Sequence, residues 1–503
     1  MHRFHLHCVS LLIACCSLPA QAQVLTWKKG QRDIRESLPP ELNQPRPWEV
    51  PVKLQLTPAA EPSPPLKYRC WIPLEQRQPG NVNASVSQAM IMYLQNPRRV
   101  ELDKQYAEVV HALPDTTGGV VIPTAALRGD IRDYLQEQAD VLKQLHFALR
   151  LDTIDSNYAA RNIHGIDAFD ASVVGAKNLR LLANLLQLES SLAIAEGRFD
   201  DALHALQSGF RLAEVAQRGN NASVIGQLIS LIFVSQMKNE VQEMLQQPAA
   251  PNMYWALASL PQQELASTTA AMQGELLAVT RKLIPWTIED LAAESESQAE
   301  DRLVALVSQV RSYIDNSIEE TAQIVAQDQL IAAVAVAAFA DRALMESEDA
   351  GAGNCQALLI WTTSDFQATM QTVVKWFYLP LDLRLARKDL FDDSISRFRG
   401  FPSSPAIALA MIGLPAVEAL DASAARSQRQ HALLITLEAL RAYAAENAGA
   451  LPETLDNLRP LPAWPDSSTG KPFKYRRNDP HHAVIHIEKS GGVPSEYHIE
   501  MRQ

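Results

Sequence analysis

The sequence has little cysteine, no excess of basic charge and no long apolar run after its first residues. Only five of its 503 residues are cysteines, and no CxxC or paired Cys/His spacing supports a structural zinc site. The formal net charge of -12 argues against a nucleic-acid partner, because such proteins carry a basic patch or stripe. The longest later apolar runs, residues 330–340 and 405–417, are shorter than the roughly 18 to 20 residues that cross a bilayer. We therefore expect no transmembrane span in the mature chain.

Motifs that carry catalytic chemistry are also missing. The chain has no Gly-x-Ser-x-Gly elbow, no His-Glu-x-x-His, no phosphate-binding glycine loop and no dinucleotide fingerprint. Acid pairs such as Asp200-Asp201 are expected to cap a helix start or to face solvent rather than to perform acid/base catalysis. The sequence thus indicates no catalytic residue and no cofactor.

The first 22 residues have the features of a secretory signal peptide. Arg3 precedes an apolar stretch over residues 8–16, and Ala20-Gln21-Ala22 supplies a small-x-small cleavage pattern. An alternative is a lipoprotein signal, because Leu12-Ile13-Ala14-Cys15 resembles a lipobox whose acylated Cys15 would tether the chain to a membrane. Both interpretations predict export, to the periplasm, to the cell envelope or out of the cell.

Cys70 and Cys355 are the two cysteines outside this leader. In an oxidising compartment they can form a disulfide that closes a very long loop. The other interpretation is two buried free thiols, and the sequence leaves both open.

The remainder predicts a mainly α-helical protein, built as a helical-hairpin array or an irregular bundle. We expect a Pro-rich linker over residues 23–66, a helical domain over 67–420 and a C-terminal module over 421–503. The clearest helix pair covers residues 179–196 and 200–217, joined at Gly197. Its spacing resembles one degenerate tetratricopeptide repeat, and an ordinary antiparallel hairpin is the alternative. A long helix or a broken pair is expected over 299–345.

The C-terminal module is expected to contain a long helix from about Asp421, a short helix after Pro452 and a small antiparallel sheet. Alternation places His482, His486 and Glu488 on one face, and His498 with Glu500 on one face of the next strand. If the strands pair, these side chains converge and become candidate ligands of zinc or copper. The competing interpretation is a solvated polar face on a sheet whose other face packs on the helix.

Several segments, taken together and in order, resemble a family of uncharacterised secreted proteins of planctomycete bacteria. These segments are GRFDDAL at 197–203, APNMYWAL at 250–257, LPETL at 451–455 and TGKPFKY at 469–475. Cys70 departs from the aliphatic residue that the family tends to have there, which makes a disulfide look less like a family feature. The resemblance implies no activity and no site residues.

From this architecture we expect a non-enzymatic, exported helical protein that binds or scaffolds a protein or peptide partner in the cell envelope. The alternatives are a periplasmic or surface hydrolase with its site in a helical cleft, and an envelope lipoprotein anchored through Cys15.

Overall fold

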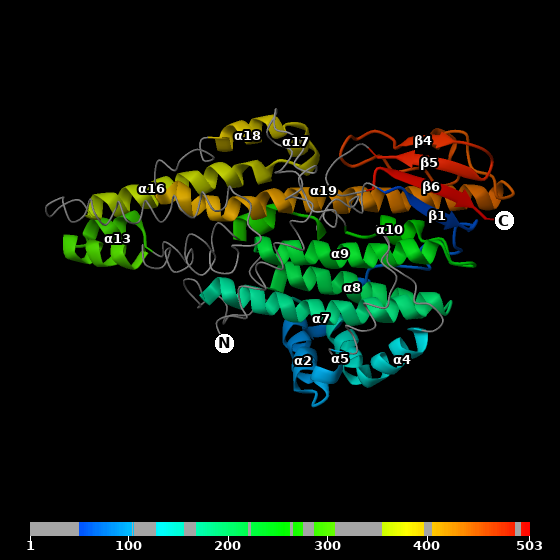
Figure 1. Ribbon diagram of the computed structural model, residues 1–503, viewed down its shortest axis with the longest axis horizontal. Helices are drawn as coiled ribbons and strands as arrows, with labels where there is room; N and C mark the ends of the chain where they lie inside the picture. The colour runs from blue at the N-terminus through cyan, green and yellow to red at the C-terminus, as the bar shows by residue number, and fades with distance from the viewer. Residues whose placement is uncertain are drawn as a thin grey trace, which may run out of the picture.

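A computed structural model describes residues 50–102, 104, 127–154, 167–219, 223–261, 265–274, 286–306, 355–396, 405–487 and 494–502. The protein is mainly helical, with a small four-stranded sheet near the C-terminus, and this part of the expected fold is confirmed. Figure 1 shows long helices stacked side by side, with the sheet beside one end of the longest of them. The predicted signal peptide, Cys15 and most of the predicted linker lie outside the described residues.

Four helices form the centre of the molecule. They are α7 (Asp167–Ala195), α8 (Phe199–Gly219), α9 (Val224–Leu245) and α19 (Pro405–Glu446). Helix α8 packs on α7 and α9, and α9 packs on α19. The turn between α7 and α8 contains Gly197 at φ 71°, a conformation that glycine adopts without strain. The predicted helix pair is therefore present, with its turn at the predicted glycine.

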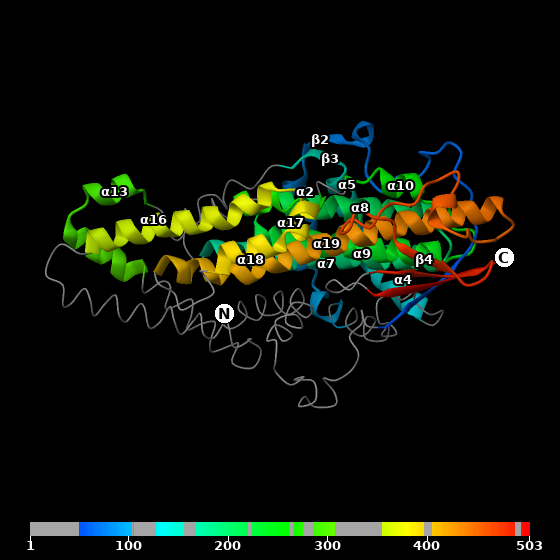
Figure 2. The same ribbon diagram turned by 90° about the horizontal axis from the view of Figure 1, so that it is seen from above.

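Smaller elements cover the two sides of this centre. On the α7 side lie α2 (Val82–Gln95), α4 (Leu127–Glu137) and α5 (Ala139–Leu149) (Figure 1). The turn η4 (Leu74–Gln76) and the two-stranded sheet of β2 (Gln78–Asn81) and β3 (Leu151–Thr153) are next to α2 and α5 in the chain. On the α19 side lie α10 (Tyr254–Ala258), α13 (Ile288–Ala293), α16 (Cys355–Val374), η5 (Lys375–Tyr378), α17 (Leu381–Ala386) and α18 (Lys388–Ser396). Figure 2 shows α16 beside the first half of α19. Of the long helix expected over 299–345, only residues up to 306 are described, and these are helical.

The terminal helix begins earlier than predicted. Helix α19 runs without a break from Pro405 through Asp421 to Glu446. The Asp421 carboxylate accepts two hydrogen bonds from the buried guanidinium of Arg384, at 2.9 and 2.6 Å. Asp421 therefore lies in the middle of a helix and binds a neighbouring helix, so it does not mark a helix start. The short helix expected after Pro452 is a single 3-10 turn, η6 (Leu455–Asn457).

The sheet is mixed, and the prediction of a purely antiparallel sheet was wrong. Strands β4 (Lys474–Arg477), β5 (His482–His486) and β6 (Glu496–Met501) are antiparallel as expected, but β1 (Val52–Leu56) adds to the edge of β6 in parallel. Strand β1 lies within the predicted Pro-rich linker. Its alternate residues Leu54 and Leu56 are 1% and 0% exposed, so burial of these side chains holds the segment against the body.

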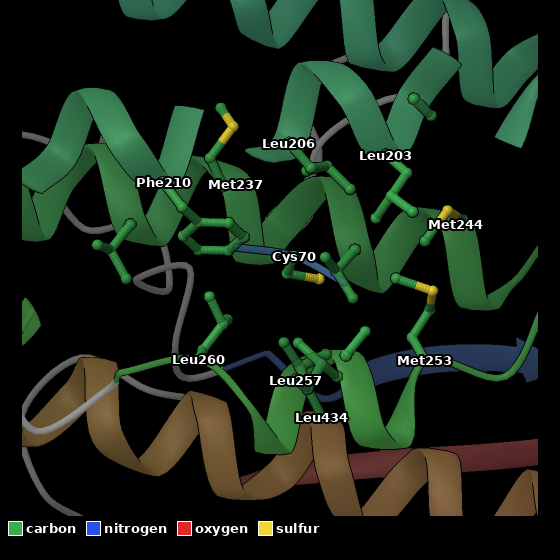
Figure 3. Close-up of a cluster of buried hydrophobic side chains, with 14 of the residues drawn as sticks. Cys70, Leu203, Leu206, Phe210, Met237, Met244, Met253, Leu257, Leu260 and Leu434 are labelled. Carbon is green, nitrogen blue, oxygen red and sulfur yellow. The ribbon is translucent and has the colours of Figure 1, made fainter. Parts of the chain in front are cut away.

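One hydrophobic cluster joins α16, η5 and α18 to α9 and α19. A larger core joins the four central helices, α2, α4, α5 and α10 to β1 and the C-terminal sheet. Cys70 lies inside it, among Leu203, Phe210 and Met237 (Figure 3). Cys70 and Cys355 are both buried, and both are free in this structure. Burial raises the pKa of the Cys70 thiol far above its usual range, which keeps it uncharged and unreactive. Among the described residues, no helix is long and apolar enough to cross a membrane.

Candidate functional site

The predicted histidine face on the sheet is present. His482 and His486 lie on one face of β5, and His498 lies opposite Val484 of that face, while Ala483 and Ile485 are buried on the other. The imidazoles of His486 and His498 each lie 3.2 Å from the carboxylate of Glu496.

His482 lies 2.9 Å from Asp479, on the same partly exposed surface. Glu488 is outside the described residues. Across the described ranges, no three His, Cys, Asp or Glu side chains are arranged so that they could hold a metal ion. In this structure the imidazoles lie within hydrogen-bond distance of carboxylates.

The segment Asn252–Trp255 packs into the interior and does not line a groove. The Asn252 amide donates to the carbonyls of Ala59 and Glu438, both at 3.0 Å, and the Tyr254 hydroxyl donates to the carbonyl of Pro462 at 2.9 Å. These bonds connect α10 to α19 and to the loop that follows it. The aromatic residues at this helix start are therefore packing anchors.

A buried ion pair on α19 fixes the loop before α10. Glu438 and Arg441 have no exposed side-chain surface, and the guanidinium Nη1 lies 2.8 Å from Glu438 Oε2. Arg441 also donates to the carbonyls of Thr57, Ala250 and Pro251, at 2.9, 2.7 and 3.2 Å. We call these residues the Arg441 junction. It holds together α19, the segment after β1 and the 250–251 loop.

An open pocket of about 460 Å³ lies against that loop. Its lining comes from the turn between α7 and α8, from Tyr68 and from the end of the α9–α10 connection. The lining residues are Tyr68, Gly197, Arg198, Phe199, Asp200, Asp201, Ala249 and Pro251. Arg198 pairs with Glu196 and Asp201 along the rim, and Asp200 is exposed. The pocket thus offers two aromatic rings and carboxylates to a ligand.

A second polar cluster lies where α5 crosses α7 and α8. His146 Nδ1 is 2.7 Å from Ser208 Oγ, and His146 Nε2 is 2.8 Å from Glu189 Oε2. We call this the Ser208–His146–Glu189 chain. The His204 ring, one helical turn before Ser208, lies with its centroid 4.3 Å from that of His146. Burial lowers the pKa of His204 to about 4, and the neighbouring His146 and Arg150 act in the same direction.

Two further groups on α9 are titratable and buried. Lys238 is fully buried, and its Nζ donates to the carbonyl and hydroxyl oxygens of Ser427 on α19, at 2.6 and 2.9 Å. Burial lowers the pKa of Lys238 well below its usual range. On the opposite side, the Glu240 carboxyl accepts hydrogen bonds from Gln187 and Ser191, and burial raises its pKa to about 8. Both groups are buried and hydrogen-bonded to residues of neighbouring helices, so they belong to the helix interfaces.

Comparisons with protein-family models, with curated proteins and with solved structures each found no match.

The sequence indicated neither the pocket nor the Ser208–His146–Glu189 chain. The three residues of the chain come from three helices. Glu189 and Ser208 follow His146 by 43 and 62 positions, so no linear motif contains all three. The one local signal is the i,i+4 spacing of His204 and Ser208, which places both on one face of α8.

Proposed function

We propose that this protein is an exported helical protein that binds a protein or peptide partner in the cell envelope, and that the pocket between Tyr68 and the α7–α8 turn receives part of that partner. The observation that carries this proposal is the pocket itself. It is open, has a volume of about 460 Å³, and is lined by the rings of Tyr68 and Phe199 and by the carboxylates of Asp200 and Asp201. The signal-peptide pattern of residues 1–22 and the resemblance to secreted planctomycete proteins support export.

The walls of the pocket are fixed before any partner arrives. Gln207 of α8 donates to the carbonyl of Arg69 at 2.7 Å, which holds the segment that carries Tyr68. The Arg441 junction holds Pro251, and Arg198 holds the α7–α8 turn through Glu196 at 2.7 Å. A rigid site loses little conformational freedom on binding, so its contacts contribute more fully to affinity.

Affinity capture from envelope extracts tests this proposal, with Asp200→Arg as the pocket variant and Asp382→Arg as the control. Both residues are exposed and lie in the first turn of a helix, so the two substitutions make the same charge change in similar surroundings. We expect a specific partner to be lost with Asp200→Arg and retained with Asp382→Arg. Equal recovery with both variants would mean that the pocket takes no part in binding.

The predicted export of the protein is tested separately by mass spectrometry of the mature N-terminus. A chain that begins at Gln23 supports the signal peptide, whereas a diacylglyceryl group on Cys15 supports the lipoprotein alternative and a membrane tether. An N-terminus at Met1 in exported fractions contradicts both.

The hydrolase alternative has one observation in its favour, the Ser208–His146–Glu189 chain.

A further inference from the structure

The geometry points to a second site, at the crossing of α5, α7 and α8, in which Ser208 is an acyl-accepting nucleophile, His146 its general base and Glu189 a positioning residue. The substrate class is an ester of a short acyl chain. This inference goes beyond partner binding and uses none of the residues that line the pocket.

The order of hydrogen bonds is the one that nucleophilic catalysis requires. A hydroxyl, an imidazole and a carboxylate are joined in sequence through 2.7 and 2.8 Å contacts, one on each ring nitrogen of His146. Such a constellation is recognised by geometry and roles, and it recurs on unrelated folds in different chain orders. When the imidazole accepts the hydroxyl proton, the carboxylate on its other nitrogen stabilises the resulting imidazolium.

Three helices hold these groups in place. Helix α5 carries His146, α7 carries Glu189 and α8 carries Ser208, and α8 packs on both α5 and α7. Ser208 is only 2% exposed, whereas the side chains of His146 and Glu189 are 13% and 30% exposed. A substrate must therefore approach along the partly exposed side chains of His146 and Glu189, and such a covered hydroxyl favours a short acyl group over a folded polypeptide substrate.

His204 supplies a neutral donor beside the nucleophile. It precedes Ser208 by one turn of α8, and its ring centroid lies 4.3 Å from that of His146, with the two planes tilted by 37°. A neutral imidazole has one N–H group, which can donate to the oxygen that gains negative charge during acyl transfer. Because the pKa of His204 is lowered to about 4, the ring is uncharged at neutral pH and does not repel a proton arriving on His146.

The reaction is balanced by the substrate and water alone. Ser208 Oγ forms a bond to the carbonyl carbon while its proton moves to His146, and the ester C–O bond breaks as His146 returns that proton to the leaving alcohol. Water then attacks the acyl-serine with His146 again as base, which releases the acid and regenerates the hydroxyl.

Labelling of the intact protein with a fluorophosphonate probe tests the inference, because the probe forms an Oγ–P bond and loses fluoride only at an activated serine. We expect one label, located on Ser208 by peptide mass spectrometry, and none in Ser208→Ala. Ser230→Ala is the matched control, since Ser230 is also fully buried but has no hydrogen-bond partner among the described residues. His146→Gln keeps a polar group at the crossing but removes the base. Its rate of labelling should be at least about 100-fold lower than that of the wild type.

Glu189 needs a comparison that separates charge from packing. Glu189→Gln keeps a side chain of the same size without the charge, and Glu189→Asp keeps the charge. Slow labelling in Glu189→Gln with partial recovery in Glu189→Asp, at equal far-ultraviolet circular dichroism, assigns the positioning role. Absence of label on the folded wild-type chain, or label on another serine, would overturn the inference. Asp382→Arg, which lies in neither site, should leave labelling unchanged. Because the labelling test and the partner-binding test change different residues, the two can fail independently.

Discussion

Glu438 and Arg441, one turn apart on α19, form an ion pair with no exposed side-chain surface, and each also binds the chain outside its own helix. Glu438 Oε1 accepts the backbone N–H of Met253 at 2.7 Å, next to the start of α10. Arg441 donates to backbone carbonyls on both sides of this point. One pair of side chains therefore fixes the loop that forms a wall of the pocket.

Replacement of Arg441 by methionine is expected to lower the free energy of unfolding by about 3 to 5 kcal/mol. The change leaves Glu438 and the carbonyls of Thr57, Ala250 and Pro251 buried without their donor. Urea denaturation followed by circular dichroism measures it. Arg98→Met is the control, because Arg98 is half exposed and pairs with Glu101 in solvent, so its loss should leave the urea midpoint unchanged. Equal midpoints for the two variants would show that the Arg441 junction contributes no stability.

Glu240 is expected to make the protein less stable as the pH rises. Its pKa in the folded protein is about 8 because of burial, above the usual value of 4.5, so the folded state binds the extra proton between these two values. The contribution of this group to the free energy of unfolding is fully present below about pH 4.5 and is lost as the pH rises through 8, by on the order of 5 kcal/mol.

Glu240→Gln imitates the protonated side chain and should remove most of this decline. Urea titrations at several values between pH 5 and 9, on wild type and variant, give the two slopes. Parallel slopes would mean that Glu240 is ionised inside the fold.

His431→Leu is expected to stabilise the protein by about 1 to 2 kcal/mol at neutral pH. His431 is 1% exposed, lies edge-on to Trp464, and neither ring nitrogen has a partner among the described residues. A buried donor without a partner costs about 1 to 3 kcal/mol, and leucine removes it at similar volume. Thermal unfolding of the two proteins measures the difference, and a lower Tm for the variant would indicate that the ring binds a group that stabilises it.

Acidification should enlarge this difference. Burial, with the nearby Lys238, lowers the pKa of His431 well below 6.5, so the unfolded state binds more protons as the pH falls through 6.5. As the pH falls below 6.5, the free energy of unfolding of the wild-type protein therefore decreases by an amount that the leucine variant does not lose. A constant difference between pH 5 and 8 would contradict this assignment.

Gly209→Ala is expected to destabilise the α8–α9 contact by about 1 to 3 kcal/mol. A methyl group at this position would overlap the sulfur of Met237 and lie 2.6 Å from its Cγ, inside a filled core. When Met237 is already alanine, Gly209→Ala should lower the free energy of unfolding by less than it does in the wild type. A double-mutant cycle of Gly209→Ala and Met237→Ala measures this difference. Gly129→Ala on α4 meets no atom within 4 Å and should be neutral or slightly stabilising.

The sequence predicted the helices better than the strands. Helices α7 and α8 repeat their apolar residues every three or four positions, and Gly197 separates them, so the information is local. Strand β1 also alternates, with Val52, Leu54 and Leu56 facing inward, but the surrounding prolines favoured a linker. Its partner β6 lies at the far end of the sequence, and no local pattern predicts such a pairing.

Among the candidate site residues, too, the sequence predicted those that follow a local pattern and missed those that depend on how distant segments pack. The alternation of His482 and His486 was readable because a strand repeats every two residues. The Ser208–His146–Glu189 chain depends on how three helices cross, which periodicity does not determine, and the pocket depends on loops held by Arg441.

The pairing of β1 with β6 also sets when the four-stranded sheet can be completed. Gln55 and Glu500, hydrogen-bonded at 3.1 Å, are 445 positions apart in the chain. During synthesis β1 emerges first and stays unpaired, with Leu54 and Leu56 uncovered, until β6, 445 positions further along the chain, has been made. An incomplete chain therefore displays an apolar strand with an open edge, which chaperones and proteases can distinguish from the finished molecule.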